Sequence, residues 1–481
     1  MSEFIRWFAD LGNHNVAEVG GKNASLGELY SQLTSRGLKV PNGFAVTAHA
    51  YRTLLAGQSL REQLQRELEQ IDLKDTSSLS QHAQRCRDLV YDAPLPDALV
   101  TEILDAHQQL LTQYGDELTV AVRSSATAED LPQASFAGQH DSYLNVRGGA
   151  ALLDACRRCF ASLFTERAIQ YRAVQGFDHL DVALSIGVMK MVRADLGASG
   201  VMFTIDTESG FDGVVLVTGA YGLGENIVQG MVDPDEFYVH KATLAKGHRA
   251  VLRRHLGSKK IRMIYGSRRG GGATFNEPTS AAERARFSIT DAEVISLAEQ
   301  AVLIENHFSQ LAAVARPMDI EWAKDGLDGE LYILQARPET VASQHKGNTL
   351  ERYHLRERGP IVVSGRAVGT RAAAARVRVA RTQAELSNLR EGEVLVAETT
   401  TPDWGSVMRR AAALVTNRGG RTCHAAIVAR ELNIPAVVGC ADATEKLKTG
   451  DEVTVACCEG ETGRVYAGRL PVEVEQTDLS G

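Results

Sequence analysis

Residues 416–432 read Thr416-Asn-Arg-Gly-Gly-Arg-Thr-Cys-His-Ala-Ala-Ile-Val-Ala-Arg-Glu-Leu432. A strand-like segment ends at Thr416, two glycines follow, and a helix-like run begins close to His424. The unpaired amides and positive dipole end of a helix N-terminus favour an anion, and Gly419 and Gly420 let the backbone approach a charged group closely. His424 is therefore a candidate to accept a phosphoryl group. For a lone histidine the alternative is a cap or a core side chain.

Length, composition and charge limit the class of protein. At 481 residues the chain is too long for one hydrophobic core, which predicts two or three domains. Its formal net charge of −8 gives no reason to expect nucleic acid or an anionic membrane as a partner. No apolar run approaches the length of a membrane span, and the first residues carry no signal-peptide pattern. Seven scattered cysteines favour a reducing, cytoplasmic compartment over a disulfide framework.

The first segment that suggests chemistry is Gly20-Gly-Lys-Asn-Ala-Ser-Leu26. Two glycines and Lys22 precede an amphipathic helix predicted from Leu26 to Arg36. The spacing differs from a Walker A loop, because Val16 stands at the first glycine position and Asn23 replaces the serine or threonine. Lys22 is a candidate phosphate ligand, and a solvated lysine at a helix start is an equal alternative on local grounds.

The second segment runs from Thr119 to Gln139. A short apolar strand is predicted to deliver Arg123 into a loop of small hydroxyl and glycine residues, where the guanidinium can bind a polyphosphate in bidentate fashion. Gln139 and a strand over Asp141–Asn145 are predicted to continue the wall of the same site. Such loops are common connections, so the arginine at the strand end carries most of this prediction.

The third segment is a predicted hairpin of two strands, 318–323 and 331–338, joined by a turn-rich connection. With a period of two, Asp319 and Glu321 share one face of the first strand, and Gln335 and Arg337 share one face of the second. The hairpin could therefore present carboxylates for magnesium, which prefers few carboxylates together with phosphate and water oxygens, beside an arginine for phosphate. A cross-strand salt bridge on a solvated hairpin is an equal alternative.

Composition changes after Thr340. Residues 341–348 are small and polar, which is typical of a linker, and short strands with a few helices follow, including a helix over 407–412. In the first part of the chain, strands at 184–192, 200–205 and 213–218 suggest a substantial sheet. We predict an α/β (α+β) chain with a first domain at 1–340, a linker at 341–355, a β-rich second domain at 356–470 and an unstructured tail at 471–481.

Taken jointly, five motifs resemble the phosphoenolpyruvate synthase (pyruvate, water dikinase) family. They are Gly20-Gly-Lys-Asn-Ala-Ser, Val122-Arg-Ser-Ser-Ala-Thr-Ala-Glu-Asp, Asp319-Ile-Glu-Trp, Gln335-Ala-Arg-Pro and Gly419-Gly-Arg-Thr-Cys-His-Ala-Ala-Ile, in the family's order and covering the chain to about Tyr466. The resemblance implies an ATP-grasp nucleotide-binding domain followed by a swivelling β/β/α phosphohistidine domain, with ATP and Mg²⁺ as ligands. It implies these site residues: Lys22, Arg123, Glu321, Gln335 and Arg337 for the nucleotide and magnesium, and His424 as the phosphorylated histidine.

The reaction that this resemblance implies is ATP + pyruvate + water to AMP, phosphoenolpyruvate and phosphate, and its first half is phosphorylation of His424. Thr422 matches the threonine that a regulatory kinase/phosphorylase modifies in bacterial members. The family continues into a C-terminal barrel that binds pyruvate, and this chain ends where the barrel would begin. We therefore expect a fragment that is competent for the ATP half-reaction, or an acceptor domain on a separate chain. The oligomeric state stays open, with a homodimer among the alternatives.

Three other functions remain as alternatives. A pyruvate, phosphate dikinase would use phosphate in place of water, and Cys423 before the histidine favours the synthase only weakly. A rifampicin phosphotransferase resembles the ATP and histidine modules but places a drug-binding domain between them. A non-catalytic phosphocarrier such as enzyme I of the sugar phosphotransferase system has a similar histidine segment without the ATP-grasp residues, so Lys22, Arg123 and Arg337 argue against it.

Overall fold

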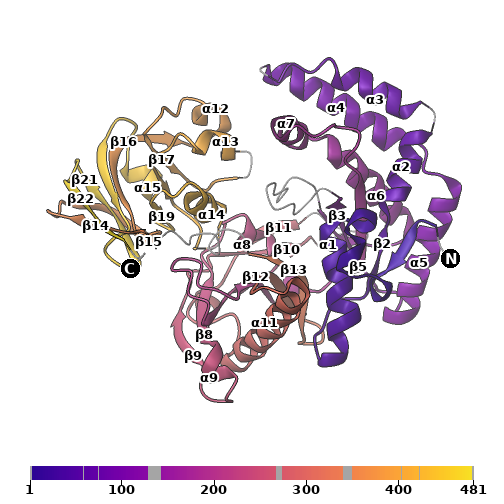
Figure 1. The fold of residues 1–481 in the computed structure, drawn as a ribbon, viewed down its shortest axis with the longest axis horizontal. Helices are drawn as coiled ribbons and strands as arrows, with labels where there is room; N and C mark the ends of the chain where they lie inside the picture. The colour runs from indigo at the N-terminus through magenta and orange to yellow at the C-terminus, as the bar shows by residue number, and fades with distance from the viewer. Residues whose placement is uncertain are drawn as a thin grey trace. The chain divides into compact units, whose positions relative to one another are not determined.

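The computed structural model describes residues 3–57, 59–73, 75–127, 142–266, 274–339, 349–401, 404–421 and 423–478 (Figure 1). They form a mixed α/β chain, as the sequence predicts. The chain divides into two units. The first unit holds Met1–Arg193, Tyr265–Thr274 and Tyr332–Arg337, and the second unit holds Ala194–Ile264, Phe275–Leu331 and Pro338–Gly481. None of the helices in the described ranges has the length and apolar character needed to span a bilayer.

An antiparallel sheet of order β1-β2-β5-β3-β4 forms the centre of the first unit. Apolar side chains of its inner strands share one core with the surrounding helices. Its strands are β1 Ile5–Trp7, β2 Gly43–Val46, β5 Leu184–Lys190, β3 Val120–Ala126 and β4 Ser142–Val146. The helices that share this core are α2 Ala48–Ala56, α3 Leu60–Leu68, α4 Thr76–Asp92, α5 Asp97–Tyr114, α6 Gly149–Ala161 and α7 Glu166–Gln175. Of these, α3 and α4 lie side by side (Figure 1).

The segment Gly20-Gly-Lys lies inside a helix rather than before one. α1 spans Val16–Glu28, but Gly20 has φ 74° and ψ 166°, so the helix breaks there and resumes at Gly21. A π-helical turn, Leu29–Leu33, and a 3-10 turn, Thr34–Arg36, complete the helical run. The predicted helix over 26–36 therefore has the right end but begins too late, because a glycine pair is typical of a helix boundary and here occupies a break within the helix.

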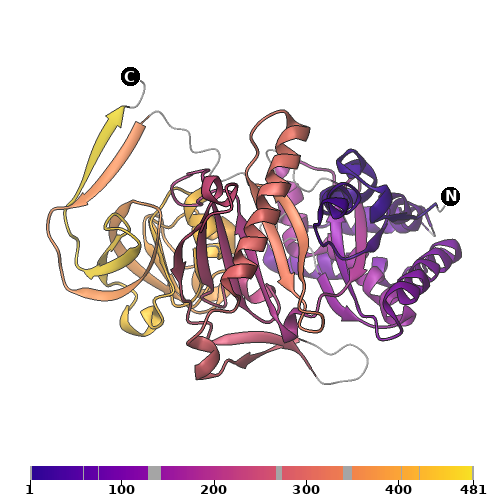
Figure 2. The same cartoon turned by 90° about the horizontal axis from the view of Figure 1, so that it is seen from below.

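The sheet of the second unit has the order β13-β12-β6-β7-β8-β9. α11, Asp291–Ala312, packs against β7, β8 and β12 (Figure 2). The strands are β12 Met318–Lys324, β6 Ala198–Phe203, β7 Val214–Tyr221, β8 Asp235–His240, β9 Val251–His255 and β13 Leu331–Pro338, of which Tyr332–Arg337 belong to the first unit. Shorter elements are α8 Glu225–Val228, α9 Lys241–Leu244, α10 Ala281–Arg284 and the paired strands β10 Ile261–Tyr265 and β11 Thr274–Pro278.

The predicted strands at 184–192, 200–205 and 213–218 all form, but they enter two different sheets. β5 lies between β2 and β3 in the first unit. β6 and β7 pair with each other in the second unit. The single-sheet expectation is therefore wrong, because apolar content and spacing predict that a strand forms but not which strand it pairs with.

A closed barrel of order β15-β19-β18-β17-β16-β20-β21 forms the C-terminal part of the second unit. The neighbours β16, β17, β18 and β19 are parallel, and the other described pairs are antiparallel. The strands are β15 Ile361–Val368, β16 Ala372–Ala380, β17 Val394–Ala397, β18 Ala413–Thr416, β19 Ala436–Val438, β20 Glu452–Ala456 and β21 Thr462–Ala467. The accompanying helices are α12 Gln383–Leu386, α13 Gly405–Met408, α14 His424–Glu431 and α15 Ala443–Lys446, so the helix predicted at 407–412 forms earlier, at 405–408.

Residues near both ends of this C-terminal region pair with each other. β14, Thr349–Leu355, runs antiparallel to β22, Val472–Asp478, with Leu355 opposite Val472 (Figure 2). Tyr353, Leu355 and Val472 pack against the buried Tyr466. The expectation of an unstructured tail is therefore wrong for residues 472–478, and residues 349–355 of the expected linker are a strand. Residues 349–355 show no regular alternation, and the alternation in Val472-Glu-Val-Glu475 is only four residues long, so neither segment predicts a strand without its partner.

Candidate functional site

His424 is the first residue of α14, as the sequence predicts. β18 ends at Thr416, and the loop that follows includes Gly419, whose φ of 103° lies in the left-handed region. Cys423 is the N-cap of α14, and its side chain is buried against Gly419. Burial raises the pKa of the Cys423 thiol, although the backbone amide of Ala426 lowers it, so the thiol beside the histidine stays neutral.

Thr400 holds the ring of His424. Its Oγ1 lies 3.0 Å from His424 Nδ1, and Thr400 is only 1% exposed. Thr400 follows β17 and His424 follows β18. These two strands are parallel neighbours, and Ala397 at the end of β17 pairs with Thr416 at the end of β18. Carboxyl ends of parallel strands lie at one edge of a sheet, so the loops after them meet. The sequence interpretation missed this role, although Thr399-Thr-Thr shortly after the apolar segment 394–397 was the available signal.

Two arginines hold the loop before His424 within the second unit. Arg421 is 6% exposed, and its Nε donates to the carbonyl of Ala367 at 3.2 Å while Nη1 donates to Tyr238 Oη at 3.3 Å. Arg430 of α14 donates to the carbonyl of Arg421 at 2.5 Å and forms an ion pair with Glu208. Burial disfavours the charge of Arg421, but Glu208 and Tyr238 favour it and the pKa of Arg421 is raised. Arg421 therefore keeps its charge while it holds the loop.

In the first unit, Arg123 lies within β3 rather than at its end. β3 continues to Ala126, and Arg123 lies opposite Gly187 of β5. The prediction that the strand ends at Arg123 is wrong, because the small residues Ser124 and Ser125, which are typical of a loop, are here buried strand residues. Arg123 itself is only half-buried, so its guanidinium lies at the margin of the core.

Arg123 and Gln335 are brought together, as expected for residues of one site. Arg123 Nη2 donates to Gln335 Oε1 at 3.2 Å, and Nη1 donates to the carbonyl of Leu334 at 3.4 Å. Gln335 is 5% exposed. Arg337 is half-buried two residues further along β13, on the strand face predicted for both residues. A buried amide therefore fixes the orientation of the guanidinium.

Lys22 is half-buried on a segment that is fastened to strands of the first unit. The backbone N of Asn23 donates to Ser125 Oγ at 3.2 Å, and its Nδ2 donates to Ser185 Oγ at 3.0 Å. Ser25 Oγ donates to the carbonyl of Ala336 at 2.6 Å. The segment that carries Lys22 is therefore held against β3, β5 and β13, and two of these strands carry Arg123 and Gln335. The sequence interpretation used Asn23 only to exclude a Walker A loop and missed its anchoring role.

Asp319 and Glu321 share one face of β12, as the period of two predicts. Ile320 and Trp322 on the other face are buried, whereas Asp319 and Glu321 are half-buried. Among the described residues, no group of three or more His, Cys, Asp or Glu side chains is arranged to hold a metal ion. Magnesium commonly takes one or two carboxylates and completes its octahedron with phosphate and water oxygens. The two remaining predicted residues, Gln139 and Thr422, lie outside the described residues.

Two family matches define the class of protein. Residues 389–460, which include His424, match the family described as "PEP-utilising enzyme, mobile domain". Residues 16–357, which include Lys22, Arg123 and Gln335, match the family described as "Pyruvate phosphate dikinase, AMP/ATP-binding domain". The chain therefore joins a region that matches an AMP/ATP-binding family to a region that matches a mobile-domain family and carries His424. It belongs to the pyruvate phosphate dikinase AMP/ATP-binding family.

Several similar curated proteins share one name. The chain is 53% identical over 480 residues to "Phosphoenolpyruvate synthase" of Pseudomonas aeruginosa, which covers 100% of this chain and 60% of that protein. It is 50% identical over 481 residues to the protein of the same name from Synechocystis sp. (99% of this chain, 59% of the relative) and 51% identical over 479 residues to that of Escherichia coli (99% and 59%). The chain thus spans about three fifths of the length of these relatives.

Proposed function

We propose that this chain uses ATP to phosphorylate His424, as the nucleotide-binding and histidine-bearing part of a phosphoenolpyruvate synthase. The observation that carries the proposal is the histidine at the start of α14 with its Nδ1 held by the buried Thr400. The AMP/ATP-binding family match supports ATP as the donor, and the name shared by the relatives supports phosphoenolpyruvate as the product of the complete enzyme.

The proposal includes an ATP-grasp fold for residues 1–340 and a swivelling β/β/α phosphohistidine domain for residues 356–470. The strands and covering helices of the nucleotide region and the barrel with α14 support this division. Since β14 occupies Thr349–Leu355 and pairs with β22, both strands belong with the second domain in this proposal. Residues 341–348 then remain as the linker that absorbs the swivelling motion.

The nucleotide is proposed to bind where Lys22, Arg123 and Arg337 supply positive charge to the triphosphate. The hydrogen bond from Arg123 to Gln335 orients one guanidinium before the nucleotide arrives. Gln139 is assigned to the wall of the same site. Phosphoryl transfer depends mainly on positioning and charge stabilisation, so these side chains need no covalent role.

Asp319 and Glu321 fit a magnesium site, since both are half-buried hard oxygen donors on one face of a rigid strand. Bound there, Mg²⁺ would neutralise negative charge on the phosphate oxygens of a nucleotide. The chain's own contribution is to present two carboxylates in a fixed geometry through the buried Ile320 and Trp322 on the opposite face.

Two ring nitrogens are available on His424, and Thr400 distinguishes them. A nucleophilic nitrogen needs its lone pair, so the proton of the neutral ring must sit on the other nitrogen. With Nδ1–H donating to Thr400 Oγ1, Nε2 becomes the nucleophile. Nε2 attacks the β-phosphorus of ATP, AMP leaves, and hydrolysis of the γ-phosphoryl group leaves a phosphohistidine. Pyruvate would receive this phosphoryl group in the complete enzyme.

Labelled ATP tests the proposal. ATP labelled in the β-phosphate should leave acid-labile, base-stable label on the wild-type chain and none on His424→Ala. Arg337→Ala should label far more weakly while keeping the wild-type circular dichroism spectrum. Labelling of His424→Ala to the wild-type level would overturn the assignment. A chain that takes label only from a phosphorylated partner protein, and none from ATP, would be a phosphocarrier.

The proposal also covers the acceptor of the γ-phosphoryl group, regulation at Thr422 and the cellular location. Release of labelled inorganic phosphate from γ-labelled ATP indicates water as the acceptor, whereas labelled pyrophosphate in the presence of phosphate indicates a pyruvate, phosphate dikinase. Thr422 is proposed as the target of a regulatory kinase/phosphorylase, because it stands two residues before His424. The cytoplasm is the proposed location, and the seven free cysteines support a reducing compartment.

A further inference from the structure

Among the residues that the structure describes, a buried arginine in the first unit, Arg172, has no carboxylate as an ion-pair partner. Arg172 lies on α7 and is 0% exposed. Its Nε donates to His179 Nδ1 at 3.2 Å, and its guanidinium lies 5.7 Å from the ring centroid of Phe164. Within the described part of the chain, neither Nη1 nor Nη2 of Arg172 has a hydrogen-bond partner. Two charged donors are therefore enclosed without an acceptor.

The ionisable groups around Arg172 do not neutralise it. The groups that favour its charge are Tyr51 of α2 and Cys86 of α4, and both are buried. Burial raises the pKa of Tyr51 and raises that of Cys86 to about 12, so both are uncharged at neutral pH. Burial and the Arg172 charge lower the pKa of His179 to about 4, so the imidazole is a neutral acceptor. Burial lowers the pKa of Arg172 to about 10, which still leaves the guanidinium charged.

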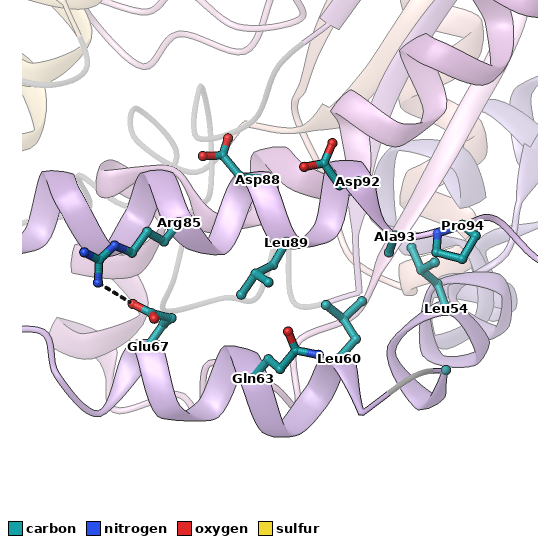
Figure 3. A pocket seen from close by; sticks show the side chains of 11 residues that line it. Leu54, Leu60, Gln63, Glu67, Arg85, Asp88, Leu89, Asp92, Ala93 and Pro94 are labelled. Atoms are coloured by element: carbon teal, nitrogen blue, oxygen red, sulfur yellow. Dashed lines mark ion pairs between the residues drawn. The ribbon is translucent and has the colours of Figure 1, made fainter.

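Three carboxylates of the neighbouring helices α3 and α4 do not compensate the charge of Arg172. A cavity of about 460 Å³ lies between α3 and α4, and its lining includes Glu67, Asp88 and Asp92 (Figure 3). Glu67 Oε2 lies 2.7 Å from His82 Nδ1 and forms an ion pair with Arg85 at 3.5 Å. Asp88 and Asp92 point away from the gap between the two helices (Figure 3). None of these three carboxylates is among the groups that act on Arg172.

A second unsatisfied donor points to the kind of occupant. Tyr51 Oη is buried and, in the described chain, has no hydrogen-bond partner. Buried charges in proteins are paired, and buried polar hydrogens find acceptors. Nη1 and Nη2 of Arg172 and the hydroxyl of Tyr51 can all donate, so the complementary group is an acceptor with negative charge. Because Arg172 is fully enclosed, that group must be small and shed its water easily.

We propose that Arg172 and Tyr51 form a buried binding site for a single halide ion, with chloride as the occupant. A halide is monatomic, accepts several donors at once and loses hydration more readily than phosphate or a carboxylate ligand does. A water molecule would satisfy one donor but leave the guanidinium charge uncompensated. The site stabilises the α2–α4–α7 part of the first unit and is separate from the residues assigned to ATP.

Thermal unfolding in matched salts tests the site. Wild-type protein, Arg172→Met and a control, Arg85→Met, are melted in sodium gluconate and in sodium chloride at equal ionic strength. A ligand that binds only the folded state raises the melting temperature, and we expect a rise of about 5 °C in chloride for the wild type and Arg85→Met. Arg172→Met should show no chloride effect. In gluconate it should melt at or above the wild-type temperature, because removal of an unpaired buried charge is neutral or stabilising.

Equal melting of the wild type in the two salts, or a wild-type chloride response in Arg172→Met, would overturn the proposal. Tyr51→Phe keeps the charge and removes one donor, so it should need several-fold more chloride for half of the effect, and it tests the site even if Arg172→Met does not fold. Crystals grown in bromide should show an anomalous scattering peak between Arg172 and Tyr51. Density without an anomalous signal there would mean a water molecule and refute a halide site.

Discussion

The chemistry of His424 depends on which ring nitrogen carries its proton. A neutral imidazole has one donor and one acceptor nitrogen, and the hydrogen bond made by the first decides the tautomer. Thr400 is 1% exposed, and its Oγ1 lies 3.0 Å from Nδ1. A hydroxyl can accept a hydrogen bond as well as donate one, so Thr400 can contact Nδ1 in the protonated and neutral ring and in the phosphorylated ring that we propose.

Thr400→Val tests this positioning role. Valine has the shape of threonine but no hydroxyl, so the ring loses its Nδ1 acceptor and populates both tautomers. We expect phosphorylation of His424 by ATP to slow on the order of 10-fold, with little change in ATP affinity. Nitrogen-15 NMR of the histidine ring should show the Nδ1–H tautomer in the wild type and a mixture in the variant. Thr400→Ser should restore both readouts, and a wild-type rate in Thr400→Val would show that the contact has no part in the reaction.

At the residue scale, the sequence predicted positions that depend on neighbouring residues in the chain. It missed contacts between residues that are distant in the sequence. His424 at a helix start follows from the glycine pair and the helical run beside it. The Thr400 contact requires that the strands before both residues are parallel neighbours, which no local pattern states. The Arg123–Gln335 hydrogen bond joins residues 212 positions apart. Their pairing was expected only because a family resemblance placed both at one ligand.

Among the elements, α1 depends on one glycine. Gly20 has φ 74° inside the helix and lies so close to Ser125 that an added Cβ would overlap its carbonyl and side chain. Gly20→Ala should therefore cost about 2 kcal/mol or more, from backbone strain and from overlap with β3. Because the break also sets the position of Lys22, ATP binding should weaken in the same variant. Chemical denaturation and nucleotide titration measure the two effects.

Gly37 provides a matched control for that prediction. It also has positive φ, at 94°, but no atom lies within 4 Å of a Cβ added there. Gly37→Ala should carry only the strain, about 1 kcal/mol, and should leave ATP binding unchanged. If the two variants lose equal stability and bind ATP equally, the close approach of Gly20 to Ser125 has no importance for the site.

In the barrel, an ion pair joins Arg378 of β16 to Glu393, the residue before β17, and makes stability depend on pH. Arg378 Nε and Nη2 donate to Glu393 at 3.0 and 2.8 Å, and these hydrogen bonds hold the pKa of Glu393 below its usual 4.5. A carboxyl whose folded pKa is lowered contributes stability that is present above 4.5 and is lost as the pH falls through its folded value. We expect Glu393→Gln to melt a few degrees below the wild type at pH 7, with a difference that shrinks towards zero as the pH falls below 4.5. Glu445→Gln, on an exposed side chain, is the control, and a pH-independent difference for Glu393→Gln would contradict the linkage.

Element prediction from the sequence failed where pairing partners are distant. β5, β6 and β7 are each apolar enough to be recognised as strands, but β5 belongs beside β2 and β3 while β6 and β7 form part of another sheet. β14 and β22 were not recognised, because Val472-Glu-Val-Glu475 beside a charged chain end has too little apolar content on its own. Pairing supplies the missing stabilisation, since each strand satisfies the backbone hydrogen bonds of the other.

Across the whole molecule, the β14–β22 pair ties the beginning of the C-terminal region to its end. Thr349 lies opposite Asp478, and Tyr353 of this ribbon packs near Tyr466 of the barrel. The closed barrel beside α14 contains neither β14 nor β22. The ribbon should therefore contribute to the stability of the second unit without taking part in the chemistry of His424.

A chain shortened to end at Leu470 tests this division. Loss of β22 leaves the backbone of β14 unpaired, exposes Tyr353 and Leu355, and removes the ion pair between Arg356 and Glu473. We expect the second unit to melt several degrees lower, while phosphorylation of His424 by ATP at low temperature stays within about twofold of the full chain, because Thr400 and α14 keep their supporting strands. A chain that ends at Asp478 keeps every residue of the ribbon and is the control. The shorter chain could lose labelling while its circular dichroism spectrum shows an intact fold. Lower stability would not explain that result, so the ribbon would then act in the phosphoryl transfer itself.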